Sequence, residues 1–188
     1  GWLREAGYEV VDLDVPEIPE AHRLWQLLLF EELRTGLAEL SERGGEQLRR
    51  SLENNFAIAE PVWGARPTLE DFVHGHTRRN EVLSRLESRF ADVPLLLTPA
   101  SAALAPLHGT DHGPIEGAKA LMDAQWPMTF VPCLGLPGAT VPTGVVDGLP
   151  GSVQLVGGRF RESWILDAAQ AIEDRAGVLT PIDPFPSS

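Results

Sequence analysis

The sequence predicts an α/β protein in which helices cover a mixed β-sheet. A long helix-forming stretch, residues 68–90, is followed by a short apolar run, residues 93–98. That run is short and lacks alternation, as is typical of a central strand covered on both faces. Two β-branched runs then follow, residues 139–146 and 152–156, with an Asp147-Gly148 turn signal between them. Helices that alternate with buried strands in this way are typical of a mixed or parallel sheet.

The N-terminal elements come first in this scheme. Residues 1–7 resemble the last turns of a helix that closes on a glycine, and residues 8–13 alternate as a strand does. Because the chain starts in mid-helix and without an initiator Met, we expect that sequence upstream has been removed. A long helical region begins at Glu20, breaks at Gly44-Gly45, and gives way to a loop over residues 61–67.

The later elements complete one predicted domain, residues 1–188, with a helical segment over 20–91 and the sheet and closing helix over 92–188. Thr68 and Asp71 form a capping-box pattern that starts the helix over 68–90. The arginines of that helix are expected to be solvated: Arg78, Arg79, Arg85 and Arg89. A short helix is predicted near residues 115–124. The closing helix has an apolar face and stops at Gly177, before an irregular tail: Ile165, Ala168, Ala169, Ile172 and Ala176 form the face, and Pro181 and Pro184 lie in the tail.

Composition excludes several classes of function. The formal net charge of −12 makes a nucleic-acid partner unfavourable. No apolar run approaches the roughly 20 residues that cross a bilayer, so no membrane partner is expected. Cys133 is the single cysteine, which favours a reducing compartment, and we expect a cytoplasmic protein. No cofactor is predicted, because phosphate-binding glycine loops and zinc-type cysteine spacings are absent from the sequence.

An ordered set of short motifs runs through the C-terminal third. In order, these are Gly-Leu-Pro, Val-Pro-Thr-Gly, a second Gly-Leu-Pro and Gln-Leu-Val-Gly: residues 135–137, 141–144, 148–150 and 154–157. A Glu-bearing helix over residues 162–173 follows. This order resembles the C-terminal part of the amidase signature family, and residues 6–16 and 78–99 match the family's preceding pattern. The resemblance covers nearly the whole chain, although any single Gly-Leu-Pro would carry no weight.

The resemblance implies hydrolysis of carboxamides to a carboxylate and ammonia or an amine by a Ser-cisSer-Lys triad. The sequence has no Gly-Gly-Ser-Ser-Gly run, and its only lysine, Lys119, does not match the family's lysine position. We therefore expect no catalytic residue in this chain and no turnover by the chain alone. Its expected partners are a small amide substrate and the missing N-terminal half, with a homo-oligomer possible. A truncated sheet should also expose an unpaired edge and apolar surface.

Two other interpretations remain open. The chain could be a non-catalytic α/β binding or assembly module that keeps the amidase fold. Within the family, it could also belong to the amidase component of a tRNA-dependent amidotransferase, although no feature of the Gly135 segment selects that component.

The predicted contribution to the site is a wall of the substrate pocket. The residues predicted to bind substrate are Thr98, Trp126, Phe130, Cys133, Gly135 and Leu136. Aromatic side chains suit such a pocket, but core packing explains Trp126 and Phe130 equally well. Cys133 fits packing better than catalysis. Gly135 and Gly138 can adopt positive φ and can allow close approach of the backbone to a neighbouring loop.

Alternative reactive groups are disfavoured. Ser101 and Lys119 could form a Ser-Lys dyad, but loop serines and helix lysines are common. His108 and His112 have the spacing of metal ligands on a helix, yet they lie in a Gly- and Pro-flanked loop. No metal site is therefore predicted.

Overall fold

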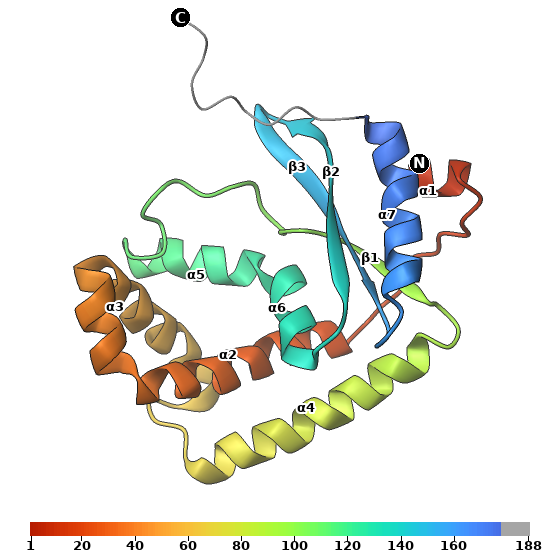
Figure 1. Cartoon of the computed structure of the whole chain (residues 1–188). Helices are drawn as coiled ribbons and strands as arrows, with labels where there is room; N and C mark the ends of the chain where they lie inside the picture. Colours follow the sequence, from red (N-terminus) through yellow and green to blue (C-terminus); the bar gives the residue numbers. More distant parts are fainter. Residues whose placement is uncertain (178–188) are drawn as a thin grey trace, which may run out of the picture.

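A computed structural model describes residues 1–177 of the chain (Figure 1). The described residues form helices and one three-stranded antiparallel sheet with the strand order β1-β3-β2. The helices are α1 (Trp2–Glu5), α2 (Glu17–Thr35), α3 (Leu37–Trp63), α4 (Leu69–Arg89), α5 (Ile115–Ala124), α6 (Trp126–Leu134) and α7 (Glu162–Ala176). The strands are β1 (Leu95–Pro99), β2 (Gly138–Val146) and β3 (Leu149–Gly157). Within this part of the chain, no helix combines the length and apolar character that a bilayer crossing requires.

The sheet is built around β3. Asp147 and Gly148 have φ values of 51° and 79°, and they form the predicted hairpin turn between β2 and β3. β1 pairs with β3 in an antiparallel register that sets Leu96 opposite Val156. Two sheet predictions are therefore wrong for residues 1–177: the sheet is antiparallel rather than mixed, and β1 is an edge strand rather than a central one. Among these residues, β3 is the only strand that pairs with β1, and both pairings in the sheet are antiparallel.

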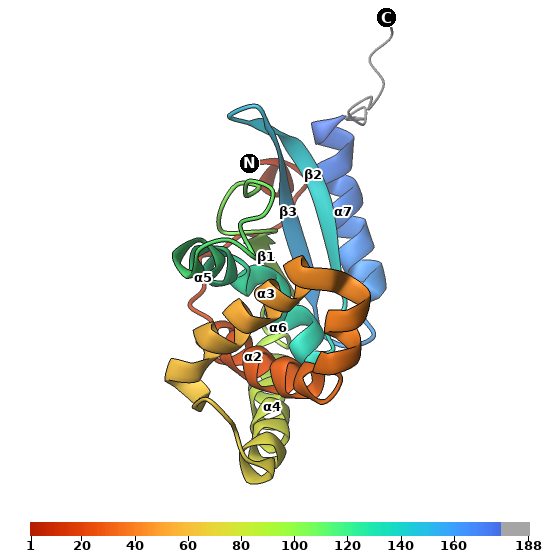
Figure 2. The same cartoon turned by 90° about the vertical axis from the view of Figure 1, so that its left-hand side faces the viewer.

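Helices cover both faces of the sheet. α7 lies along the β2–β3 hairpin (Figure 1 and Figure 2), and it buries Ile165, Ala168 and Ile172 against one face. This confirms the predicted apolar face, and the helix stops at Gly177, which has a φ of 74°. Helices α2, α4 and α6 enclose the larger core cluster, to which β1 contributes Leu96. The predicted irregular tail at Pro181 and Pro184 lies outside the described residues.

The N-terminal strand prediction is wrong. Residues 8–13 form no helix and belong to no ladder. Strand pairing requires a neighbouring backbone, and within residues 1–177 this segment has none at hydrogen-bonding distance in a ladder. A side chain bonds one of its carbonyls instead, since Arg4 Nη2 donates to the Val10 oxygen at 2.8 Å.

Three local predictions about the helical segment can be judged directly. The capping box is confirmed: the Thr68 amide donates to Asp71 Oδ2 at 2.7 Å, and the Asp71 amide donates to Thr68 Oγ1 at 3.1 Å. The break at the glycine pair is also confirmed, since Gly45 has a φ of 69° inside α3. The loop starts later than predicted, because Pro61 still lies within α3.

The arginines of α4 are paired rather than simply solvated. Arg89 Nε lies 3.0 Å from Oε2 of the buried Glu17, and Arg85 Nη2 lies 2.5 Å from Glu20 Oε2. Arg78 also pairs with Glu20. These arginine side chains stay 36–49% exposed. The pairs to Glu20 lie near the surface, where ion pairs contribute little to stability, whereas Glu17 is buried; together the pairs fix how α2 lies against α4.

Candidate functional site

Helix α6 positions most of the residues predicted to form the pocket wall. The sequence analysis missed this helix, since Pro127 and Pro132 are typical helix breakers. Pro127 is buried in the first turn, where a backbone N–H has no helical partner to lose. The helix ends at Gly135, whose φ of 66° and ψ of 42° confirm the predicted left-handed conformation. Gly138 does not use this freedom, because it lies in β2 opposite Val156.

Two arginines hold the C-terminal end of α6. Arg79 Nε donates to the Cys133 carbonyl, and Arg159 Nη2 donates to the Leu134 carbonyl at 3.2 Å. The last carbonyls of a helix have no helical partner and carry partial negative charge, so guanidinium groups stabilise them. The turn at Gly135 is therefore fixed from both α4 and the loop after β3. The sequence analysis did not predict that Arg79 and Arg159, which are far apart in the chain, bind neighbouring carbonyls at the end of α6.

A buried polar link joins the sheet to the start of α6. Gln154 Nε2 donates to the Pro127 carbonyl at 2.5 Å and to Thr98 Oγ1 at 3.3 Å. Thr98 and Gln154 are both more than nine-tenths buried. The predicted pocket wall omitted Gln154, although it is the first residue of the Gln-Leu-Val-Gly motif. The motif was therefore the signal that could have identified it.

A buried histidine on α2 fixes the other side of α6. His22 Nδ1 lies 2.7 Å from Thr129 Oγ1, and Gln26 Nε2 lies 3.1 Å from His22 Nε2. Because the Gln26 amide nitrogen can only donate, His22 Nε2 accepts and Nδ1–H donates to Thr129. Burial lowers the pKa of His22 below its ordinary value of 6.5, outweighing the opposing effect of Asp123. His22 is thus neutral at pH 7.

This histidine predicts a loss of stability in acid. A lowered pKa means that the unfolded chain takes up the proton first, so the contribution of neutral His22 is complete above pH 6.5 and is lost as the pH falls below it. We expect the free energy of unfolding to fall by at most about 1.4 kcal/mol per pH unit from this group. Urea unfolding between about pH 5 and 8 measures this slope.

Two matched variants separate the contribution of His22 to this pH dependence from the contributions of other groups. His22→Gln should flatten the slope, whereas His74→Gln, on the exposed side of α4, should leave it unchanged. A slope that survives in His22→Gln would show that another group causes it.

Two of the six predicted wall residues meet at a groove beside β1. This space, called here the β1 groove, has a volume of about 670 Å³ and is lined by Thr98 and Trp126, by the rest of β1 and by residues 8–15. Phe130, Cys133 and Leu136 instead point into the larger core cluster. Gly135 lies at a separate shallow hollow with Arg159. The six residues therefore do not converge on one cavity, and their role in substrate binding stays a prediction.

Comparison with known proteins decides the family. The model of the family described as Amidase matches residues 1–166. The chain belongs to the amidase signature family. It is 31% identical over 184 residues to an indoleacetamide hydrolase of Bradyrhizobium japonicum, and 27% identical over 205 residues to a glutamyl-tRNA(Gln) amidotransferase component of Mesorhizobium japonicum.

These comparisons also show how much of an amidase the chain represents. The two alignments cover 94% and 96% of this chain but only 37% and 38% of the relatives. The fold matches allophanate hydrolase of Kluyveromyces lactis with a TM-score of 0.72 and 19% identity, over 93% of this chain and 28% of that one. The chain therefore spans little more than a third of these curated relatives, and its α/β fold is that of part of an amidase signature enzyme.

The structure disfavours the three residues considered above as alternative reactive groups, Cys133, Ser101 and Lys119. Burial raises the pKa of the Cys133 thiol to about 11, so the thiol stays protonated and unreactive at neutral pH. Ser101 donates to the Ala124 carbonyl at 3.4 Å. Lys119 Nζ pairs with Asp123 Oδ2 at 2.5 Å on the exposed side of α5. Ser101 and Lys119 therefore form no dyad in this arrangement.

The two histidines in the loop after β1, His108 and His112, contact each other, and His112 also contacts the neighbouring Asp111. The rings of His108 and His112 meet edge to face at 6.3 Å between centroids, and His112 Nδ1 lies 3.1 Å from Asp111 Oδ1. Over residues 1–177, no group of three or more His, Cys, Asp or Glu side chains is placed to hold a metal ion.

Proposed function

We propose that these 188 residues are the C-terminal portion of an amidase that hydrolyses carboxamides to a carboxylate and ammonia or an amine. The observation that carries this proposal is the amidase family match over residues 1–166, in a sequence that has no Gly-Gly-Ser-Ser-Gly run and only one lysine, Lys119. We propose that the Ser-cisSer-Lys triad lies on polypeptide upstream of these residues. We also propose that residues 1–188 act as one structural unit within that larger enzyme, in the cytoplasm.

The chemistry assigns the two portions different tasks. The serine oxygen of the upstream portion attacks the amide carbonyl carbon, the C–N bond breaks, and the amine leaves with a proton. Water then attacks the acyl-serine ester and releases the carboxylate. These steps need a surface that positions the acyl group, because orientation lowers the barrier to attack. We assign that positioning to the chain described here.

Thr98 and Trp126 are the residues that we propose to contact the substrate. Both line the β1 groove, at the C-terminal end of β1 and the start of α6. The other four predicted wall residues support this surface from behind: Phe130, Cys133 and Leu136 in the core, and Gly135 at the end of α6. The Gln154 link holds the two contact residues together, because it bonds both Thr98 and the carbonyl of Pro127.

A chimera tests this function. The matching segment of the Bradyrhizobium indoleacetamide hydrolase is replaced by these 188 residues, and ammonia release from indoleacetamide is measured. We expect release above the uncatalysed rate from the chimera and none from the isolated chain. A folded but inactive chimera would contradict the proposal. So would amide hydrolysis by the isolated chain that Ser101→Ala or Lys119→Ala abolishes.

A further inference from the structure

We propose that the end of α6 carries an anion-binding site, in which Arg79 and Arg159 hold the phosphate group of a small organic phosphate and Phe160 contacts the organic part. The site lies at Gly135, at the opposite end of α6 from Trp126. It is therefore separate from the β1 groove and goes beyond the proposed function, and the two are tested separately.

The first observation is that two guanidinium groups meet at Gly135. A Cβ atom at this position would lie 3.5 Å from Arg79 Nη2 and 3.6 Å from Arg159 Nη2. Apart from Gly135 and its chain neighbours, no other atom of residues 1–177 lies within 4 Å of that point. Because residue 135 is glycine, the space that both positive groups border is left open.

The second observation is that both guanidinium groups have donors to spare. A guanidinium carries five N–H donors. Arg79 uses Nε for the Cys133 carbonyl, and its Nη1 lies 3.5 Å from Asn80 Oδ1. Arg159 uses Nη2 for the Leu134 carbonyl at 3.2 Å. Among residues 1–177, Arg79 Nη2 and the Nε and Nη1 groups of Arg159 therefore remain available to a ligand.

The third observation is that neither charge is neutralised. Within residues 1–177, Arg79 and Arg159 form no ion pair, although the chain is acidic overall. The other arginines of α4 all pair with glutamates of α2: Arg78, Arg85 and Arg89. Two neighbouring guanidinium groups repel each other, and a doubly charged anion between them removes that repulsion. A phosphate group suits this site better than a carboxylate, because it carries a charge of about −1.5 to −2 at pH 7 and three acceptor oxygens.

The fourth observation is the conformation of Phe160. Its φ is 64°, in the left-handed region that bulky residues rarely adopt, and it is 90% exposed. Strained backbone of this kind is concentrated at functional sites, and burial of the ring does not compensate for it here. Phe160 and Arg159 line one hollow of about 420 Å³ with Leu136 and Pro137, so an apolar or aromatic ligand body fits beside the guanidinium. Glu162 also lines this hollow, but it forms no ion pair with Arg159.

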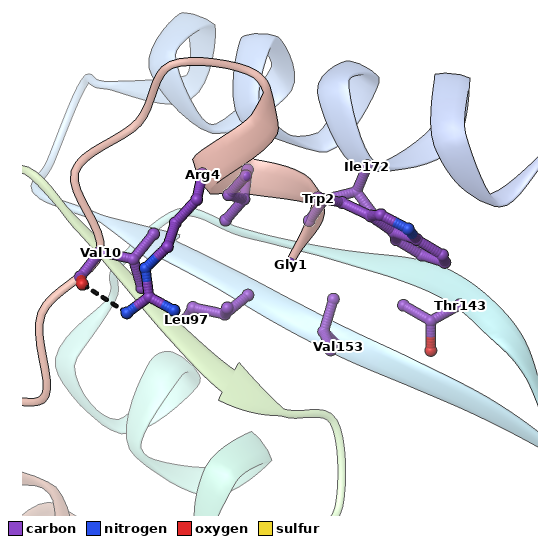
Figure 3. A pocket seen from close by; sticks show the side chains of 9 residues that line it. Gly1, Trp2, Arg4, Val10, Leu97, Thr143, Val153 and Ile172 are labelled. Carbon is purple, nitrogen blue, oxygen red and sulfur yellow. Dashed lines mark hydrogen bonds between the residues drawn. The ribbon is translucent and has the colours of Figure 1, made fainter.

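Two other hollows suit an anion less well. Three acidic residues line the β1 groove: Glu9, Asp12 and Asp14. The hollow beneath α1 and α7 has a volume of about 220 Å³ and is mostly apolar, and Figure 3 shows Arg4 there, bonded to the Val10 carbonyl. Neither hollow brings two guanidinium groups to one point, as the end of α6 does.

The test is binding of phenyl phosphate to the 188-residue chain, measured by isothermal titration calorimetry at constant ionic strength. We expect one-to-one binding that is about fivefold tighter than that of inorganic phosphate, because the phenyl ring contacts Phe160. Arg79→Gln and Arg159→Gln should each weaken it about tenfold or more, since each removes charge-assisted hydrogen bonds. Arg66→Gln makes the same charge change at an exposed residue between α3 and α4, and should alter the affinity by less than about twofold.

A further variant separates binding from folding. Glycine adopts a φ of 64° without strain, so Phe160→Gly should unfold at the same urea concentration as the parent or at a higher one. The same variant should bind phenyl phosphate no more tightly than inorganic phosphate. Far-UV circular dichroism checks that both arginine variants are folded, and if one of them is not, the other decides.

Each outcome decides the proposal. Binding that both arginine variants lose and Arg66→Gln keeps supports it. Absence of binding, or unchanged binding in folded Arg79→Gln and Arg159→Gln, overturns it. Benzoate bound as tightly as phenyl phosphate would make the ligand a carboxylate, and inorganic phosphate bound as tightly would make it free phosphate without a role for Phe160; either result overturns the assignment to an organic phosphate. Ammonia release by the chimera is a separate readout, so its failure would contradict only the proposed function.

Discussion

Replacing Phe130 with alanine is expected to lower the free energy of unfolding by about 3–5 kcal/mol, the range for removing a fully buried aromatic side chain. Phe130 has no exposed surface and lies in the larger core cluster. That cluster joins α6 to α2 and α4, so the cavity would open where three helices meet. Because small domains have only about 5–15 kcal/mol of stability, the loss would be severe. Urea unfolding monitored by circular dichroism measures it.

A neighbour on the same helix supplies the control. Met128 is 41% exposed, so Met128→Ala should cost less than about 1 kcal/mol. The pair also tests the two interpretations of Phe130 as core or as pocket lining. A folded Phe130→Ala protein of nearly unchanged stability would mean that its ring does not support the core.

Predictions from local sequence agree with the structure where the interactions are also local. The capping box at Thr68 depends on residues three positions apart, and the hairpin turn depends on Asp147 and Gly148 alone. The apolar face of α7 follows from helical spacing in one segment. In each case the stabilising contact is formed by neighbours in the sequence, so the pattern carries the information.

Predictions failed where the partner is distant in the sequence. β1 was expected to be central because it is apolar throughout, but its ladder partner β3 is nearly 60 residues away and its other edge is free. The arginines of α4 were expected to be solvated, yet Glu17 and Glu20 approach them from α2. Helix α6 forms despite two prolines, because packing against α2 outweighs local propensity.

At the candidate site, too, features that depend on short motifs could be predicted, and features that depend on distant contacts could not. The resemblance in sequence led to the prediction of Thr98 and Gly135 as site residues, and it drew attention to the motif that contains Gln154. It gave no means of showing that Phe130 and Cys133 are buried in the core, whereas Trp126 packs against the edge of that core and also lines the β1 groove. The direction of each side chain on α6 is set by α2, and the His22–Thr129 contact joins residues 107 positions apart.

Replacing Gln154 with leucine is expected to destabilise the protein by about 2–3 kcal/mol. Leucine is similar in size, so little cavity forms, but the Pro127 carbonyl and the Thr98 hydroxyl both lose a donor inside the fold. A buried polar group without a partner costs more than an average hydrogen bond contributes. The measurement is again the free energy of unfolding in urea.

Two comparisons isolate the link from general effects of the substitution. Gln170→Leu, on the exposed side of α7, should change stability by less than about 0.5 kcal/mol. Thr98→Val should cost less than Gln154→Leu, because Gln154 keeps its bond to Pro127. The double variant should then cost less than the sum of the two, since both changes break the same contact. Strict additivity would mean that Thr98 and Gln154 act independently, and that the sheet and α6 are joined by apolar packing instead.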